Sequence, residues 1–522
     1  MATQTPAPPL TPLVPWWRRI DGPIWVLIAS VAAVLSVRLV MLTTGIARFD
    51  SDEAVTGVMA QRILDGDFPA YFGIQNYNGA LEQYLQAPVL ALLPDTPLSL
   101  RLVQVALSVV ICVLVYLVGT RMVGSRWGGA LAAALYAVGP YYSAIKSVRS
   151  HGGYDAAVIL GLLVVLLVLR LRREDARSGW TVALVGLCAG VAIWESYLAV
   201  YLLIPAALWL VGSARGSIAR LLPWGIGGFI VGIAPIIAFR LANGLNPPSG
   251  TGSPPETSFG GRMELLLNPV MSQFLGVRSG VGIFDRLLPA ALVSMLALAV
   301  LGAAVWTRRW GLWDLLTLRA GRRQPIDILL LAFVITPFIY AASSYTWFAG
   351  EPRYLFTLYP FLAIGIAAAV FALHGRPRIV LAALILTVSG LLLIGTMRAV
   401  AERGGEIAAA DGGLVYTEDL PEVADALEQR GVRSAWADYW VANPLQFHAG
   451  DAIAVASTGI EHFPATAEQV RRDPGAAVVS VTGPGADAMA AKLRSEGRTF
   501  TMSTIGRFTI FTGIAPPVRA LG

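Results

Sequence analysis

The stretch RFDSDEAVTGVMAQRILDGDFP, Arg48 to Pro69, follows a long apolar run with almost no break. It places three carboxylates, those of Asp50, Asp52 and Glu53, where a hydrophobic segment has just left a membrane. Asp50 can cap a helix, with Glu53 at capping-box spacing. One acid suffices for a cap, however, and three acids packed together repel one another. The surplus favours a functional site over the plain alternative of helix capping.

The composition indicates a polytopic membrane protein. The chain has 522 residues, of which 56% are hydrophobic and 14% are charged, whereas soluble domains carry about 25% charged residues. Apolar runs long enough to span a bilayer recur along the chain. The net charge of +6 comes almost entirely from arginines between these runs. That pattern reflects topology and predicts no nucleic-acid partner.

We expect about eleven membrane spans, and the arginines between them predict their orientation. The fifth and sixth spans are short enough to form a re-entrant pair instead of two crossings. Six arginine clusters all fall on one face, which the positive-inside rule makes cytoplasmic. The predicted spans are 23–46, 98–120, 128–146, 154–171, 179–194, 197–213, 220–241, 285–306, 326–347, 354–373 and 378–399.

This topology divides the chain into three parts. Residues 1–22 are Pro-rich and predict a disordered cytoplasmic N-terminus. Residues 23–400 form the transmembrane part, whose first outer loop is 47–97. Residues 401–522 lie outside and alternate short strands with helices, which predicts a small α/β domain. Heavy use of Ala, Gly and Arg, with Lys nearly absent, indicates a GC-rich bacterial genome, so the expected location is a bacterial plasma membrane.

The first outer loop predicts two amphipathic helices that lie flat in the interface. One apolar stripe falls on Val55, Val58, Met59 and Ile63; a second runs from Leu81 to Leu92 and bends at Pro88. Between them, YFGIQNYNG combines aromatic rings and amides that suit sugar rings and hydroxyls. The later loop 242–284 is rich in Pro, Gly and Ser and is either a lid or a spacer.

Three motifs resemble one family. The pair Asp52-Glu53, the stretch YNGALEQYLQAP and EPRYLFTLYP at 351–360 are similar to those of GT-C membrane glycosyltransferases. The closest branch contains protein O-mannosyltransferases and the lipid A aminoarabinose transferase. The resemblance implies an all-α transmembrane fold and a polyprenyl-phosphate-linked sugar as donor. It also implies inverting displacement, with Asp52 as general base and Glu53 supporting it.

The expected donor-phosphate ligands are cations at the outer face. The family match assigns Arg353 to the phosphate, and Lys146 and Arg149 in AIKSVRSHGGYD are further candidates. Alternatively, Arg353 pairs with Glu351 or reaches toward lipid headgroups.

The same motifs and the isolated polar residues supply the expected sugar and acceptor ligands. Glu195 stands among apolar residues, where it could orient an acceptor or pair with an arginine. A lone histidine such as His151 is more often structural. The full set is Tyr77, Asn78, Glu82, His151, Tyr154, Glu195 and Tyr354. The histidines show no metal-ligand spacing, so no cofactor is expected; a divalent metal, which some GT-C enzymes use, is possible but not indicated.

The predicted function is therefore transfer of a hexosyl or pentosyl unit to an extracytoplasmic glycan, lipid or protein. The rival class is a transporter or lipid flippase, with Glu195 lining its path. A receptor-like scaffold that presents residues 401–522 is a third reading, but it leaves Asp50, Asp52 and Glu53 unexplained. The sequence assigns no oligomeric state.

Overall fold

The computed structural model describes residues 21–75, 77–171, 179–213, 218–244, 258–278, 290–319, 321–343, 350–410 and 412–519. The predicted disordered N-terminus lies almost wholly outside these residues. The stretch NPPSGTGSPPETS, residues 246–258 of the loop expected to be a lid or spacer, also lies largely outside the described residues.

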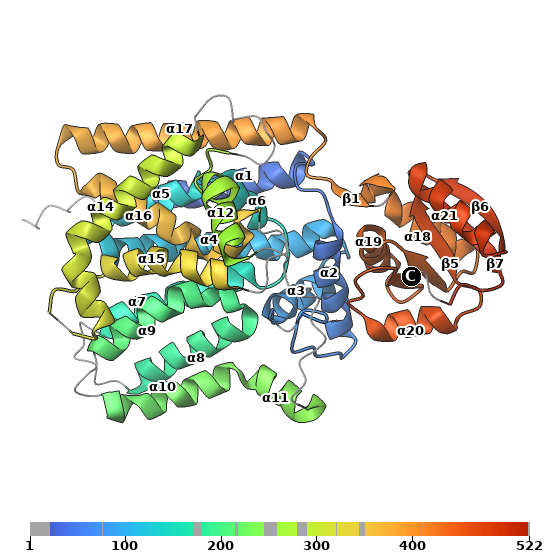
Figure 1. The fold of residues 1–522 in the computed structure, drawn as a ribbon, viewed down its shortest axis with the longest axis horizontal. Helices are drawn as coiled ribbons and strands as arrows, with labels where there is room; N and C mark the ends of the chain where they lie inside the picture. The colour runs from blue at the N-terminus through green and yellow to red at the C-terminus, as the bar shows by residue number, and fades with distance from the viewer. Residues whose placement is uncertain are drawn as a thin grey trace, which may run out of the picture.

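Long apolar helices run side by side to form the bundle in Figure 1. Within the described residues, six helices are long and apolar enough to cross a membrane. A seventh span results if α10 and α11, bent by 59°, count as one. The predicted count of eleven therefore stays a prediction. The helices are α1 (Gly22–Thr43), α4 (Pro97–Val123), α5 (Arg126–Ala137), α6 (Tyr141–Lys146), α7 (Tyr154–Leu171), α8 (Gly179–Glu195), α9 (Val200–Ser213), α10 (Ile218–Gly232), α11 (Ala234–Asn243), α14 (Ala290–Leu316), α15 (Ile326–Ala342), α16 (Tyr359–Phe371) and α17 (Arg376–Glu402).

Several expected spans are interrupted, and the interruptions supply site residues. The expected helix 128–146 breaks at Gly139-Pro140 into α5 and α6, because proline disfavours helical geometry at the residue before it. The expected helix 354–373 begins as a 3₁₀ helix, η4 (Pro352–Leu358), before it becomes α16. A short 3₁₀ helix, η2 (Tyr197–Ala199), separates α8 from α9.

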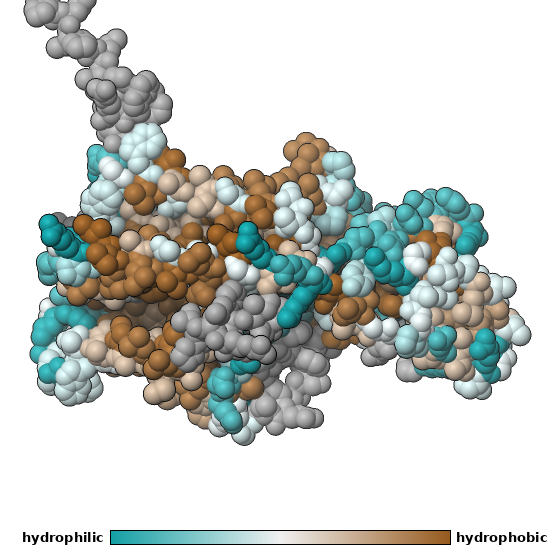
Figure 2. All heavy atoms as spheres, turned by 90° about the horizontal axis from the view of Figure 1, so that it is seen from above, coloured by the Kyte–Doolittle hydropathy of each residue, from teal (hydrophilic) through white to brown (hydrophobic). Residues whose placement is uncertain are grey.

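Apolar side chains cover much of the bundle surface, as Figure 2 shows. Helices α14 and α17 are largely exposed despite their apolar composition, which fits a surface that faces lipid. Charge inside the bundle has partners: Arg38 of α1 is fully buried and donates to the Ser147 hydroxyl at 3.2 Å. Inward-facing, hydrogen-bonded ionisable groups are the rule in membrane proteins.

The two helices predicted in the first loop are present as α2 (Ser51–Leu64) and α3 (Leu81–Leu92). In Figure 1, α2 crosses one end of the bundle, between the long helices and the C-terminal domain. We call this the domain end. The predicted amphipathic surface helix is wrong for α2, since every residue from Glu53 to Ala60 is buried. Its outer side is covered by helix α19 (Tyr439–Ala449) of the C-terminal domain.

The C-terminal region folds as the predicted alternation of strands and helices. Its five-stranded sheet has the order β4-β3-β5-β7-β6, with β3 parallel to β4 and β5, and with β7 antiparallel to β5 and β6. The sequence did not indicate α19, α20 or β6. The elements are the small hairpin β1 (Ala408–Ala410) and β2 (Gly413–Val415), α18 (Leu420–Gln429), β3 (Ser434–Ala437), β4 (Ala454–Ser457), α20 (Pro464–Arg472), β5 (Ala477–Val481), α21 (Pro484–Ser495), β6 (Thr499–Ile505) and β7 (Phe508–Ala515).

Part of the expected lid or spacer loop 242–284 is helical. It contains α12 (Phe259–Leu265), the π-helical segment η3 (Leu266–Val270) and α13 (Met271–Phe274). The ring of Phe274 packs on that of Tyr359 at the start of α16, 4.8 Å between centroids. The described residues of this loop that form α12, η3 and α13 therefore pack against the bundle.

Candidate active site

Asp50 begins helix α2 and joins it to the loop after α6. Its Oδ1 accepts a hydrogen bond from the Glu53 backbone N–H at 3.0 Å, which confirms the predicted cap. Its Oδ2 lies 2.6 Å from an Arg149 nitrogen and 3.5 Å from His151 Nε2. Burial alone would raise the pKa of Asp50, but the Arg149 charge, with His151, brings it well below its usual value. Asp50 is therefore a structural anion.

Asp52 lies two residues after Asp50, in the first turn of α2, and is more exposed: 23% of its side chain is accessible to solvent. Its Oδ2 lies 3.6 Å from an Arg353 nitrogen, and its Oδ1 accepts a hydrogen bond from the Tyr439 hydroxyl at 2.7 Å. Burial raises the pKa of Asp52, but Arg353, together with His151 and the Tyr439 hydrogen bond, brings the pKa below the usual value. Asp52 is thus an ionised, reachable proton acceptor at neutral pH.

Glu53 faces away from Asp52. Its two carboxylate oxygens each accept a 2.7 Å hydrogen bond from Arg101 of α4, and its side chain is fully buried. The predicted capping box is therefore half correct: Asp50 caps α2, but Glu53 does not bond back to it. This bidentate pair fixes α2 on α4. Glu53 can support Asp52 only through position.

Arg353 lies beside Asp52, and Lys146 is a second cation near Arg353. Arg353 is carried by η4, and Lys146 ends α6. The Arg353 charge makes it less favourable to charge Lys146. Lys146 Nζ lies 3.4 Å from His151 Nδ1 and 5.6 Å from the centre of the Tyr142 ring. Burial lowers the pKa of His151 to about 3, so it is neutral and leaves the Lys146 charge available.

Arg149 does not suit its predicted role at the donor phosphate. Its guanidinium bonds Asp50, the Glu406 carboxylate at 3.1 Å and the Arg48 carbonyl at 2.6 Å. It is buried. Because two carboxylates already neutralise its charge, Arg149 is poorly suited to bind a phosphate. We assign it instead to joining α2, the loop after α6 and the C-terminal linker.

Glu195 and Glu82 also have structural partners in place of a ligand. The Glu195 carboxylate accepts the backbone N–H groups of Leu81 at 2.9 Å and Glu82 at 3.1 Å, so it caps α3. Glu82 accepts from Gln104 at 2.7 Å and from the Ala156 N–H at 2.9 Å. Both acids are buried. Glu195 thus bonds backbone N–H groups instead of the arginine that was one of its two expected partners, and its expected acceptor contact stays a prediction.

Gly79 makes the Glu195 cap possible, and its replacement tests that cap. A Cβ at this position would lie 2.7 Å from Glu195 Oε2 and 2.7 Å from the Trp194 carbonyl oxygen. Gly79→Ala should therefore destabilise the fold by about 1–3 kcal/mol, seen as a lower unfolding temperature in detergent. Gly227→Ala, with no atom within 4 Å of its Cβ, is the control. Equal unfolding temperatures for both variants would contradict the close packing at Glu195.

The remaining predicted sugar ligands divide into two groups. The Asn78 side chain donates to Gln75 at 3.1 Å within its own loop and is buried, so it shapes the loop. Tyr77, Tyr154 and Tyr354 are half-buried, and their hydroxyls are near enough to influence one another. These tyrosines lie close to Arg353, which brings aromatic rings to the cationic side of Asp52.

Sequence patterns did not indicate several residues that contact Asp52, Tyr439 or Arg149. Tyr439 and His462 come from the C-terminal domain, and Glu406 comes from the linker before it. Glu406 accepts the Tyr141 hydroxyl at 2.9 Å. No local pattern relates residue 439 to residue 52; only the docking of α19 on α2 does.

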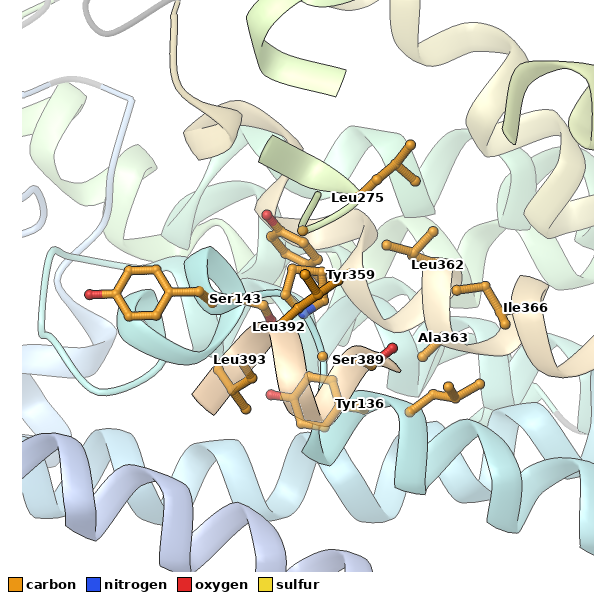
Figure 3. A pocket seen from close by; sticks show the side chains of 15 residues that line it. Tyr136, Ser143, Leu275, Tyr359, Leu362, Ala363, Ile366, Ser389, Leu392 and Leu393 are labelled. Carbon is orange, nitrogen blue, oxygen red and sulfur yellow. The ribbon is translucent and has the colours of Figure 1, made fainter. Parts of the chain in front are cut away.

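A mostly apolar groove is lined by residues of α5, α6, α16 and α17 and of the turn after α13, and Figure 3 shows its lining. The lining includes Tyr141, whose hydroxyl donates to Glu406. Glu406 also pairs with Arg149. The lining residues are Leu135, Tyr136, Gly139, Pro140, Tyr141, Ser143, Leu275, Gly276, Tyr359, Leu362, Ala363, Ile366, Ser389, Leu392 and Leu393.

Metal binding receives no support from side-chain placement. Among the described residues, no three His, Cys, Asp or Glu side chains group as metal ligands. The expectation that no cofactor takes part stays a prediction.

Comparisons with known proteins agree on the architecture. Residues 79–239 match the family model described as dolichyl-phosphate-mannose-protein mannosyltransferase. ArnT from Cupriavidus metallidurans bound to undecaprenyl phosphate superposes with a TM-score of 0.59 at 12% identity, covering 96% of this chain and 100% of that one. Its apo form gives 0.60 at 12% identity, covering 95% and 99%.

A more distant relative shares the same architecture. The oligosaccharyltransferase of Archaeoglobus fulgidus in complex with Zn and sulfate gives a TM-score of 0.54 at 13% identity, covering 94% of this chain and 73% of that one. No curated protein sequence matches. The resemblance found in the sequence is confirmed: this chain has the fold of the GT-C membrane glycosyltransferases.

Proposed function

We propose that this protein is an inverting glycosyltransferase that moves a sugar from a polyprenyl phosphate to an acceptor hydroxyl. One observation carries the proposal. An ionised, partly exposed Asp52 stands beside Arg353, and a second cation, Lys146, is near Arg353, at the end of a bundle built to lie in a membrane. The relative ArnT has been crystallised with undecaprenyl phosphate, which is the lipid such a donor would release.

Asp52 supplies the base for this reaction. The acceptor oxygen attacks the sugar's anomeric carbon while its proton passes to the Asp52 carboxylate. The bond between that carbon and the phosphate oxygen breaks, and the electron pair stays on the phosphate. Attack and departure on opposite faces invert the anomeric centre. Asp52 suits this step because its pKa keeps it ionised before the acceptor arrives.

Arg353 and Lys146 would stabilise the departing phosphate. A phosphate is a good leaving group at neutral pH and needs positive charge rather than a proton. Without donor, Arg353 lies 3.6 Å from Asp52. An arriving phosphate would draw Arg353 toward itself and so free Asp52 for the acceptor.

The apolar groove of Figure 3 is a suitable place for the donor's lipid chain. Its lining is apolar over most of its length, and its Tyr141 end lies near the cationic cluster. Tyr77, Tyr154 and Tyr354, on the Arg353 side, offer rings on which a sugar could stack.

The proposed orientation places the domain end outside the cell. Helix α4 begins just after α3, so its last turn, with Arg121, lies at the opposite end from the C-terminal domain. Arginines enriched at that opposite end favour the cytoplasmic side for it. Asp52 and residues 401–522 would then face the extracytoplasmic acceptor.

A transporter is less well supported than a glycosyltransferase, because Glu195 has a structural role. Glu195 was the intramembrane acid that could have lined a path, but it caps α3 and is fully buried. The asymmetric loop that carries α2 and α3 is also unlike the paired halves of many transporters.

The direct test uses the full-length protein in nanodiscs. It is incubated with undecaprenyl phosphates that carry a hexose or a pentose, and released undecaprenyl phosphate is measured with and without host envelope extract as acceptor source. Release that depends on the protein and on the extract supports the proposal. No release from any donor, by protein that is folded and binds undecaprenyl phosphate, would reject it.

Lys146→Met should weaken undecaprenyl phosphate binding by about 10-fold or more, because a charge-assisted contact to the phosphate is lost. The measurement is quenching of tryptophan fluorescence in nanodiscs. The chain's other lysine, Lys492, lies on α21 of the C-terminal domain. Lys492→Met is thus the matched control and should bind normally. Equal affinity for the two variants would exclude Lys146 from the phosphate site.

A further inference from the structure

Tyr439, at the first turn of α19, reaches from the C-terminal domain to the candidate base. Its hydroxyl donates to Asp52 Oδ1 at 2.7 Å. The other Asp52 oxygen, Oδ2, faces Arg353 at 3.6 Å. Each carboxylate oxygen therefore has a different neighbour, and the Tyr439 bond fixes which one an acceptor can reach.

Three contacts fix Tyr439 against the first turns of α2. The Ser51 hydroxyl donates to the Tyr439 carbonyl at 2.5 Å, and the Asn443 amide donates to that same hydroxyl at 2.7 Å. Further along, the Phe447 ring lies against Gly57, where a Cβ would come within 2.5 Å of it. The register between α19 and α2 is thus set by both polar and steric contacts.

His462 lies beside the hydroxyl of Tyr439. It is buried, its Nε2 lies 3.5 Å from the Tyr439 hydroxyl, and its ring meets Phe72 edge-on at 5.8 Å. Burial lowers the pKa of His462 to about 4, so the ring is neutral at pH 7. Since the one Tyr439 proton points to Asp52, a hydrogen bond between the two side chains would have His462 Nε2–H donate to the Tyr439 oxygen. The donors would then run in one direction, from His462 through Tyr439 to Asp52.

We propose that Tyr439, supported by His462, is a positioning residue for Asp52, so that the docked C-terminal domain forms part of the catalytic site. This inference rests on the proposed function. The Tyr439 bond holds Oδ1 and leaves Oδ2 to take the acceptor's proton. The domain is then required for turnover and not only for recognising the acceptor.

The bond from Tyr439 also stabilises the ionised form of Asp52. Without it, burial and nearby negative charge act with less opposition, so the carboxyl holds a proton to higher pH. The charged and titratable groups around Asp52 come from α2, the loop after α6, α7, η4 and the C-terminal domain; they are Asp50, His151, Tyr154, Arg353, Tyr439 and His462.

Carbodiimide labelling of Asp52 tests the bond without relying on turnover. The reagent attacks protonated carboxyls, so labelling of Asp52, read by mass spectrometry against pH, reports its protonation. Tyr439→Phe should move the midpoint up by roughly one pH unit. Tyr416→Phe, in the same domain and outside the site, should not move it. An unmoved midpoint in folded Tyr439→Phe protein would overturn the proposal.

Turnover with undecaprenyl-phosphate sugars tests the consequence. Tyr439→Phe should lower turnover by about 10-fold or more, with undecaprenyl phosphate affinity and unfolding temperature unchanged. His462→Phe should lower turnover as well, whereas His462→Gln keeps a side-chain N–H and should retain more. Normal turnover in both Tyr439→Phe and His462→Phe would overturn the positioning role. A shifted labelling midpoint in protein that never releases lipid would instead reject the proposed function alone.

Discussion

Asp52→Asn is expected to lower release of undecaprenyl phosphate by about 10²–10⁴-fold, the usual contribution of a general base. Asparagine has nearly the same shape as aspartate and can still meet the Tyr439 hydroxyl through its amide oxygen. It cannot take a proton from the acceptor. Because Arg353 and Lys146 are retained, affinity for undecaprenyl phosphate should not fall, and loss of the negative charge near Arg353 should favour it.

Asp65→Asn is the matched control, since Asp65 is exposed just after α2 and lies outside the candidate site. It should turn over normally. The measurements are the initial rate of lipid release and the affinity for undecaprenyl phosphate, both in nanodiscs. Asp52→Asn protein that matches the wild-type rate would remove Asp52 from the reaction.

The pH dependence has a defined sign. The folded pKa of Asp52 lies below the usual aspartate value, so its ionised form is stabilised by folding. This contribution is present above the pKa of the unfolded chain and is lost as pH falls through the folded pKa. The acid limb of the rate should follow the same fall.

Sequence patterns located the candidate base because its signal is local. Asp50 as a cap and Asp52 in the first turn follow from residue spacing, and both are observed. The neighbouring Glu53 carries the same type of charge, yet it faces Arg101 of α4. Which of two adjacent acids is open and which is paired depends on a helix almost fifty residues away, so no local pattern distinguishes them.

The same dependence on distant parts of the chain explains why sequence patterns did not reveal the partners of Glu195 and Arg149. Sequence correctly identifies Glu195 and Arg149 as ionisable groups in apolar surroundings, which must have partners. For Glu195, the partners are backbone N–H groups at the start of α3. Backbone donors carry no signature in a sequence, whereas a lone charge in an apolar run is conspicuous.

The C-terminal domain shows a complementary case. Strands β3, β4, β5 and β7 and helices α18 and α21 could be predicted, because each depends on local periodicity. Helix α19 contains Pro444 and several residues that favour strands, so it was not predicted. Yet α19 carries Tyr439 to Asp52, and only tertiary packing reveals it.

Breaking the buried pair of Glu53 and Arg101 should have the largest effect on stability. Arg101→Met leaves a fully buried carboxylate without its bidentate partner, which should cost about 3–5 kcal/mol. The measure is the free energy of unfolding in mixed micelles. The exposed pair Arg472–Glu468 is the control; Arg472→Met should cost under about 1 kcal/mol. If Arg101→Met were no more costly than Arg472→Met, this pair would not hold α2 on α4.

The double variant Glu53→Leu/Arg101→Met separates positioning from chemistry at Glu53. Replacing both charges with apolar groups removes the unpaired charge, so much of the lost stability should return. If Glu53 acts only by holding α2, the double variant should then recover turnover along with stability. A stable double variant that releases no lipid would mean that the Glu53 carboxylate takes part in the reaction, as the family resemblance suggested, in spite of its distance from the opening beside Asp52.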